Sequence, residues 1–122
     1  MILGEFRDGF PRVTLSLVGA DGRPAAVEFI VDTAFDGDLK LPATLLRRLQ
    51  TNELGTQTRM LVDGSLVECA HHEVTLLWES EPLLVRALVM PGNALLGTNP
   101  LLGAHLDIEM DEGGEVVIEL PG

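Results

Sequence analysis

The stretch Val27-Glu28-Phe29-Ile30-Val31-Asp32-Thr33-Ala34 places a carboxylate directly after a mostly apolar run. The residues that follow, Phe35-Asp36-Gly37-Asp38, have the composition of a turn, because Asp and Gly favour turn conformations. We therefore expect a buried strand that ends at residue 31 and a tight loop that begins at Asp32. A carboxylate in this place is costly unless it is hydrogen-bonded or shares its charge with a neighbour. This makes Asp32 the first candidate functional residue, the alternative being an Asp that only caps a turn.

The rest of the chain is predicted to consist mainly of short strands. Residues 12–17 alternate polar and apolar side chains, and turn-forming residues lead from them into the strand before Asp32. We expect these two strands to form a hairpin with Asp32 at its tip. Further strands are expected at residues 57–62, 66–78, 82–90, 95–97, 106–110 and 115–120. Short strands at regular spacing with little helix predict an all-β fold.

One short helix is expected after Pro42, a residue that suits the first helical position. Leu45, Leu46 and Leu49 would form its apolar stripe, opposite arginines 47 and 48. A further helical turn is expected over residues 98–102.

Composition restricts the possible classes of protein. The chain has 122 residues, of which 46% are hydrophobic, so we expect one folded domain over residues 1–122. Its net charge of −11 argues against binding to nucleic acid or to acidic membrane surfaces and favours neutral or basic substrates. Cys69 is the only cysteine, which suits a reducing compartment. With no signal-peptide pattern and no stretch of membrane-spanning length, a cytoplasmic location is expected.

Three segments, in order, resemble the retroviral-type aspartic proteases, and in particular their small single-domain prokaryotic members. Val31-Asp32-Thr33-Ala34-Phe35-Asp36-Gly37 resembles the catalytic Asp-Thr-Gly loop of that clan. Leu61-Val62-Asp63-Gly64-Ser65 resembles the flap hairpin, and its Asp-Gly pair favours a tight turn. Leu95-Leu96-Gly97-Thr98-Asn99-Pro100-Leu101-Leu102 resembles the segment that packs beneath the catalytic loop. The resemblance implies a retropepsin-like closed β-barrel, an acid-protease half with one short helix and a flap hairpin.

The resemblance also implies a reaction. Two neighbouring carboxyl groups that share one proton supply a base and an acid together, which suits the attack of water on a peptide bond. One chain offers only one such loop, so the second Asp32 would come from a symmetric partner. The expected function is that of a homodimeric aspartic endopeptidase acting on extended, mainly apolar peptides or unfolded proteins. No cofactor and no metal are expected.

By resemblance, the hydroxyl group of Thr33 would bond across the dimer axis and the backbone around Ala34 would orient the carboxylate. The expected flap residues are Val62, Asp63, Gly64 and Ser65. Leu96 and Gly97 would support the catalytic loop from below. Ala34 departs from the family, which usually has Gly there, and an alanine with positive φ would cost about 1–2 kcal/mol.

The sequence is also compatible with two other functions. Ala34 motivates a non-catalytic peptide-binding or assembly module on the same dimeric fold. The acidic charge motivates an enzyme that becomes active only with a partner or after a drop in pH, since acidification would reduce repulsion between the two chains.

The remaining polar candidates are expected to be structural. Asp36 and Asp38 are expected to be solvated turn residues. His71 and His72 are neighbours on a predicted strand, so they point to opposite faces and are not expected to share a metal ion.

Overall fold

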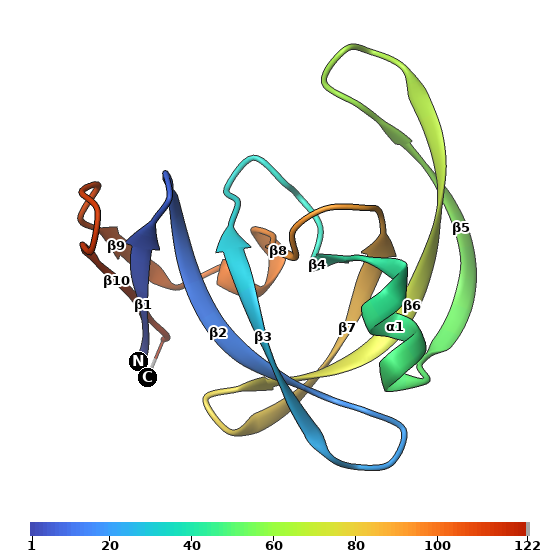
Figure 1. Ribbon diagram of the computed structural model, residues 1–122, viewed down its shortest axis with the longest axis horizontal. Helices are drawn as coiled ribbons and strands as arrows, with labels where there is room; N and C mark the ends of the chain where they lie inside the picture. Colours follow the sequence, from blue (N-terminus) through green and yellow to red (C-terminus); the bar gives the residue numbers. More distant parts are fainter. Residues whose placement is uncertain (122) are drawn as a thin grey trace.

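The computed structural model describes residues 1–121 and consists of ten strands with two short helical segments (Figure 1). The strands are β1 (Ile2–Arg7), β2 (Phe10–Val18), β3 (Pro24–Val31), β4 (Leu39–Leu41), β5 (Asn52–Met60), β6 (Leu66–Trp78), β7 (Glu81–Val89), β8 (Leu95–Leu96), β9 (His105–Ile108) and β10 (Glu115–Glu119). The helical segments are α1 (Ala43–Leu49) and a 3-10 turn, η1 (Asn99–Leu101).

The strands form one sheet that closes on itself. Their order is β5-β6-β7-β4-β8-β3-β2-β1-β10-β9, and β6 also pairs with β2, where Leu17 lies opposite Leu76. This additional pairing closes β2, β3, β8, β4, β7 and β6 into a ring. The predicted all-β class and closed barrel are confirmed. The outer parts of β5 and β6 extend beyond the ring as a two-stranded arm, on the right in Figure 1.

The barrel interior is filled by one face of each strand. Because successive side chains of a strand point to opposite faces, Val13, Leu15 and Leu17 of β2 all point inward and are buried. Phe29 and Leu96 are fully buried in the same core. Burying side chains of this size contributes roughly 1.5–3 kcal/mol each, so the strands that carry the Asp32 loop rest on a well-stabilised base.

The predicted helix is present as α1, but it begins at Ala43, and Pro42 is its extended N-cap rather than its first helical residue. Leu46 and Leu49 are buried and Leu45 packs against the core. The helix ends at Leu49 and is capped by Gln50, whose left-handed conformation (φ 54°, ψ 47°) lets its backbone N–H bond to the carbonyl groups of the last turn.

The strand β1 is a finding that the sequence patterns did not predict. Apolar residues do not alternate regularly along it, and Gly4 interrupts it. A Cβ atom on Gly4 would lie 2.0 Å from the carbonyl oxygen of Arg12, so glycine is needed for the close approach of β2. Pairing with β2 on one side and β10 on the other defines this strand.

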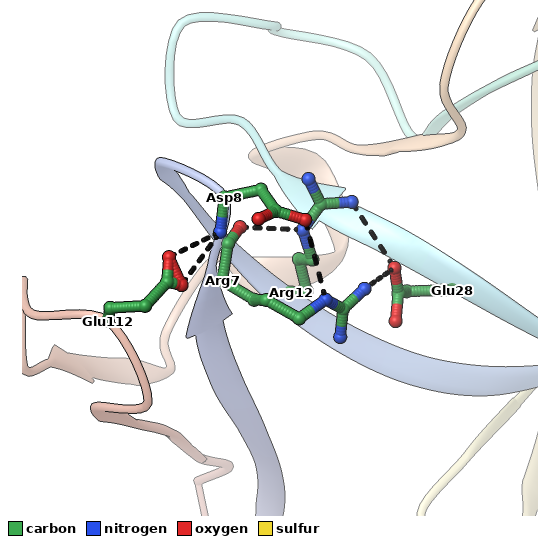
Figure 2. A network of polar contacts seen from close by, with 5 residues as sticks. All are labelled: Arg7, Asp8, Arg12, Glu28 and Glu112. Atoms are coloured by element: carbon green, nitrogen blue, oxygen red, sulfur yellow. Dashed lines mark hydrogen bonds and ion pairs between the residues drawn. The ribbon is translucent and has the colours of Figure 1, made fainter.

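A polar network fixes the β1–β2 hairpin to its neighbours (Figure 2). Glu28 on β3 accepts hydrogen bonds from Arg7 (2.6 Å) and Arg12 (3.2 Å). The backbone N–H of Asp8, at the hairpin turn, donates to the two carboxylate oxygens of Glu112 (2.7 and 3.0 Å). The hydrogen bond from Arg7, opposed by partial desolvation, holds the pKa of Glu28 below its usual value.

Two details of the sequence prediction were wrong. Asp32 does not lie at the tip of the β2–β3 hairpin: the turn of that hairpin contains Gly19 and Arg23, and Asp32 follows the other end of β3. The strand β5 begins at Asn52 rather than at residue 57, with an irregularity of register between Glu53 and Gly55. Such an irregularity breaks the period of two that sequence patterns detect.

Candidate active site

Asp32 stands where β3 leaves the barrel. Its backbone N–H donates to the carbonyl oxygen of Leu96 (2.9 Å), which continues the parallel pairing of β3 with β8. The backbone N–H of Ala34 donates to Oδ1 of Asp32 (3.0 Å), and the N–H of Phe35 donates to the Asp32 carbonyl oxygen (3.2 Å). The half-buried carboxylate is therefore oriented by its own loop.

The segment after β8 interlocks with this loop. The N–H of Gly97 donates to the carbonyl oxygen of Asp38 (2.8 Å), and the N–H of Asn99 donates to that of Gly37 (3.2 Å). Both the backbone N–H and the hydroxyl group of Thr98 donate to the carbonyl oxygen of Phe35 (2.9 and 3.2 Å). A Cβ atom on Gly97 would lie only 2.1 Å from the Gly37 oxygen. Four hydrogen bonds thus hold residues 35–38 against residues 97–99.

Ala34 is not strained. Within the described residues, the non-glycine positions with positive φ are Asp8, Gln50, Glu79 and Ser80, so the condition under which alanine would be costly here does not arise. Ala34 and its neighbour Thr33 are both exposed.

The predicted flap is a tight turn at the end of the β5–β6 arm. The N–H of Leu61 donates to the carbonyl oxygen of Ser65 (2.8 Å), and the N–H of Gly64 donates to that of Leu61 (2.9 Å). Ser65 donates its hydroxyl group (2.6 Å) and its N–H (2.9 Å) to Oδ1 of Asp63, and these bonds lower the pKa of Asp63. Gly64 has φ 86°, as a left-handed turn position requires. Val62 is fully exposed.

A cleft of about 670 Å³ lies between the loop and the arm. From the loop, Asp32, Ala34 and Phe35 line it, and from the arm its lining includes Leu61 and Val62. Of the sequence-predicted site residues, the cleft brings together Asp32 and Ala34 from the loop and Val62 from the flap. Its lining does not include Thr33, Asp63, Gly64 or Ser65. Leu96 and Gly97 do not line it either: Leu96 is buried in the core, and Gly97 lies against Gly37 and Phe35 of the loop. The loop and the arm's tip lie on the same side of the barrel in Figure 1.

Arg59 is a site residue that sequence reasoning missed. Its guanidinium group lies 2.6 Å from Oδ1 of Asp36 and 5.7 Å from the centre of the Phe35 ring, so it links β5 to the loop. The hydrogen bond from Arg59 and its charge lower the pKa of Asp36. Asp36 is exposed, as predicted, but its carboxylate is paired. Asp38 lies in a bend, as predicted, but it is only partly solvated: it is half-buried, and its Oδ2 accepts a hydrogen bond from the backbone N–H of Arg86 (2.9 Å).

Lys40 is a second missed residue. It lies on β4 between Leu39 and Leu41, which are fully buried, and its side chain lines the cleft together with Asp32. Its Nζ donates to the carbonyl oxygen of Pro91 (3.1 Å). Burial lowers the pKa of Lys40, and the negative charge of Asp32 acts in the opposite direction. The only sequence signal was a single charged residue in an apolar strand.

The two neighbouring histidines have different surroundings. Nδ1 of His72 lies 2.9 Å from the hydroxyl group of Thr51. His71 is 8% exposed, and its Nδ1 has no hydrogen-bond partner in the described part of the chain. Among residues 1–121 no group of three or more His, Cys, Asp or Glu side chains is arranged to hold a metal ion. No helix in this range is both long and apolar enough to cross a membrane.

Comparisons with known proteins support the fold. No family model and no curated protein matches the chain. Among solved structures, it is similar to EIAV protease in complex with the inhibitor HBY-793, with 21% sequence identity and a TM-score of 0.61 over 78% of this chain and 88% of that chain. It is also similar to a retropepsin-like aspartic protease from Rickettsia conorii, with 14% identity and a TM-score of 0.58 over 100% of this chain and 92% of that one. The chain therefore has a retropepsin-like fold, as the sequence resemblance predicted.

Proposed function

We propose that the protein is a homodimeric aspartic endopeptidase in which each subunit supplies one Asp32. The observation that carries the proposal is the position of this carboxylate: it is oriented by the Ala34 N–H, and it lines a cleft between an interlocked loop and a hairpin arm. The retropepsin-like fold supports this assignment, because the EIAV and Rickettsia conorii proteins named above are both proteases.

In this proposal the two Asp32 carboxyl groups hold one proton between them. The ionised group removes a proton from water, which attacks the carbonyl carbon of the peptide bond. The protonated group gives its proton to the carbonyl oxygen, so that a tetrahedral diol forms. The carboxyl group that took the proton from water then passes it to the amide nitrogen, while the other carboxylate removes a proton from a hydroxyl group of the diol, so that the C–N bond breaks and a carboxylic acid and an amine are released. The carboxyl groups return to their starting protonation states.

Other predicted residues take supporting parts in the proposal. The exposed Thr33 would bond to the partner's loop across the symmetry axis, and the interlock at Leu96 and Gly97 would keep the two loops in register. The arm's tip, Val62 to Ser65, would cover an extended peptide and exclude water from it. The exposed apolar side chains of the arm suit contact with apolar peptide segments.

The test is proteolysis of a reduced and alkylated unfolded protein, with the products identified by mass spectrometry. We expect cleavage at mildly acidic pH, inhibition by a statine-type peptide and loss of cleavage in Asp32→Asn. Asp21→Asn is the matched control, because it removes the same charge in the β2–β3 turn, at the other end of β3 from the site. Undiminished cleavage by Asp32→Asn would contradict the proposal.

The dimer is tested separately by sedimentation between pH 4 and 8. We expect a dimer that tightens as the pH falls, because protonation reduces the repulsion between two chains of charge −11. A monomer at every pH would contradict the two-carboxylate site. A dimer that binds peptides without cutting them would instead indicate the peptide-binding module.

A further inference from the structure

The registers of four adjacent strands place Lys40 on the same sheet face as the residues leading to Asp32. On neighbouring strands, Ile30 lies opposite Leu95, Leu95 opposite Lys40, and Lys40 opposite Leu88. Residues directly opposite each other in a sheet point to the same face. This row of four side chains therefore forms one surface, and Asp32 follows Ile30 by two residues.

Lys40, Asp32 and Leu95 line two spaces. One is the cleft of about 670 Å³ beneath the arm. The other is a pocket of about 310 Å³ whose remaining walls include Phe10 and Ile30. The second pocket is thus largely apolar, and its polar side chains are those of Lys40, Asp32 and Asn93.

The ammonium group of Lys40 has unused hydrogen-bonding capacity. Of its three N–H donors, one is accounted for by the carbonyl oxygen of Pro91. Within residues 1–121 its nitrogen has no carboxylate partner closer than 4.0 Å, whereas Arg59, the other cation lining the cleft, is paired with Asp36. Asp32 favours the charged form of Lys40 from beyond 4.0 Å, so a carboxylate that reached Nζ would add the close, hydrogen-bonded ion pair that the described residues do not supply.

We propose that Lys40 is a specificity-determining residue that selects peptides carrying a glutamate side chain in the pocket beside Asp32. The aliphatic part of this glutamate would pack against Phe10 and Leu95, and its carboxylate would accept hydrogen bonds from Nζ. This inference rests on the proposed function and names the substrate class for the same site. It differs from the preference for neutral or basic substrates that net charge predicts, because the local cation outweighs the distant acidic surface.

The charge of Asp32 does not oppose this preference. In the proposed dimer the two Asp32 groups share a proton and carry one negative charge, while two Lys40 side chains carry two positive charges. The charged groups lining the cleft and the pocket are otherwise Asp36 and Arg59, which neutralise each other. The centre of the paired clefts is therefore net positive.

The test uses two pools of randomised heptapeptides, identical except that the fixed central residue is Glu in one and Gln in the other. The pools are compared with the wild type, Lys40→Met and Lys40→Arg, each checked for folding by circular dichroism. We expect the wild type to cleave the Glu pool with about 5–10-fold higher kcat/KM, since a charged hydrogen bond is stronger than a neutral one. We expect this ratio to fall to about 1 in Lys40→Met and to be largely retained in Lys40→Arg.

Binding of the same pools, followed by fluorescence anisotropy, separates this inference from the proposed activity. Cleavage of both pools at equal rates, or a Glu preference that persists in Lys40→Met, would overturn the role of Lys40 and leave the endopeptidase standing. Absence of cleavage with a Lys40-dependent preference for binding the Glu pool would support the recognition and contradict the endopeptidase. Absence of both cleavage and Glu-selective binding would overturn the inference.

Discussion

Residues 97–99 pack tightly against residues 35–38 of the candidate catalytic loop. We therefore expect the small change Gly97→Ala to lower the stability of the protein severely. The added methyl carbon would lie 2.1 Å from the Gly37 carbonyl oxygen and 2.8 Å from Cδ2 of Phe35, whereas ordinary van der Waals contact begins near 3.4 Å. The Gly37 oxygen cannot simply withdraw, because it accepts the hydrogen bond from the Asn99 N–H. The loop and the segment below it must therefore separate by about an ångström.

The magnitude follows from the two consequences of that separation. Overpacking of a tightly packed interior costs roughly 1–3 kcal/mol. Loss or lengthening of one backbone hydrogen bond adds about 1 kcal/mol. We therefore expect the free energy of unfolding to fall by about 2–4 kcal/mol, a large part of the stability of a chain of this size.

Urea unfolding followed by circular dichroism measures this loss. With a slope near 2 kcal/mol per molar urea, the midpoint should fall by roughly 1–2 M. Gly19→Ala is the control, because the same methyl group would there meet a flexible carboxylate oxygen of Asp21 at 3.1 Å, and we expect it to cost less than 1 kcal/mol. A loss for Gly97→Ala no larger than that of the control would refute the reasoning.

Three further predictions concern the surroundings of the site. Ala34→Gly should lower the free energy of unfolding by about 0.4–1 kcal/mol, because Ala34 has no positive φ to relieve and glycine adds freedom to the unfolded chain; stabilisation in urea unfolding would contradict this. Glu28→Gln should cost about 0.5 kcal/mol at pH 7. Because the pKa of Glu28 is lower in the folded state, its contribution to stability is present above the unfolded pKa of 4.5 and is lost as the pH falls through the folded pKa. The urea midpoints of the wild type and Glu28→Gln should therefore converge in acid. A difference between the two midpoints that stays the same at every pH would contradict the pairing with Arg7. Arg59→Met should speed amide hydrogen exchange in the β5–β6 arm several-fold while the barrel amides keep their rates, and unchanged exchange in the arm would refute the link to Asp36.

The parts of the fold that could be read from the sequence are those with a local pattern. The alternation at residues 12–17, the leucine stripe of α1 and the Asp63-Gly64 turn all reflect contacts within a few residues, and the structure contains each of them. The strand β1 lacked such a pattern. Its position depends on pairing with β10, more than a hundred residues away in the chain. Closure of the barrel likewise depends on the distant pair Leu17 and Leu76.

The candidate site likewise contains residues that local sequence patterns predicted and residues that they did not. The order of three motifs singled out Asp32, the arm's tip and Gly97 as candidates, because each motif has its own composition. Arg59 and Lys40 carry no motif, and each becomes significant only through a partner brought close by the barrel. The sequence shows that Lys40 is a charged residue between two leucines. It does not show that Lys40 lies near Asp32, because Asp32 follows a different strand.

The two connections of the candidate catalytic loop to the rest of the molecule differ in kind, and this difference suits the proposed function. Beneath the loop, four hydrogen bonds and the contact at Gly97 join two segments above a buried core, so any movement there would break packed contacts. Above the loop, the ion pair between Asp36 and Arg59 is exposed, and water can replace it at little cost. The arm should therefore open without moving Asp32. A peptide could then enter the cleft while the carboxylate keeps the orientation that the Ala34 N–H gives it.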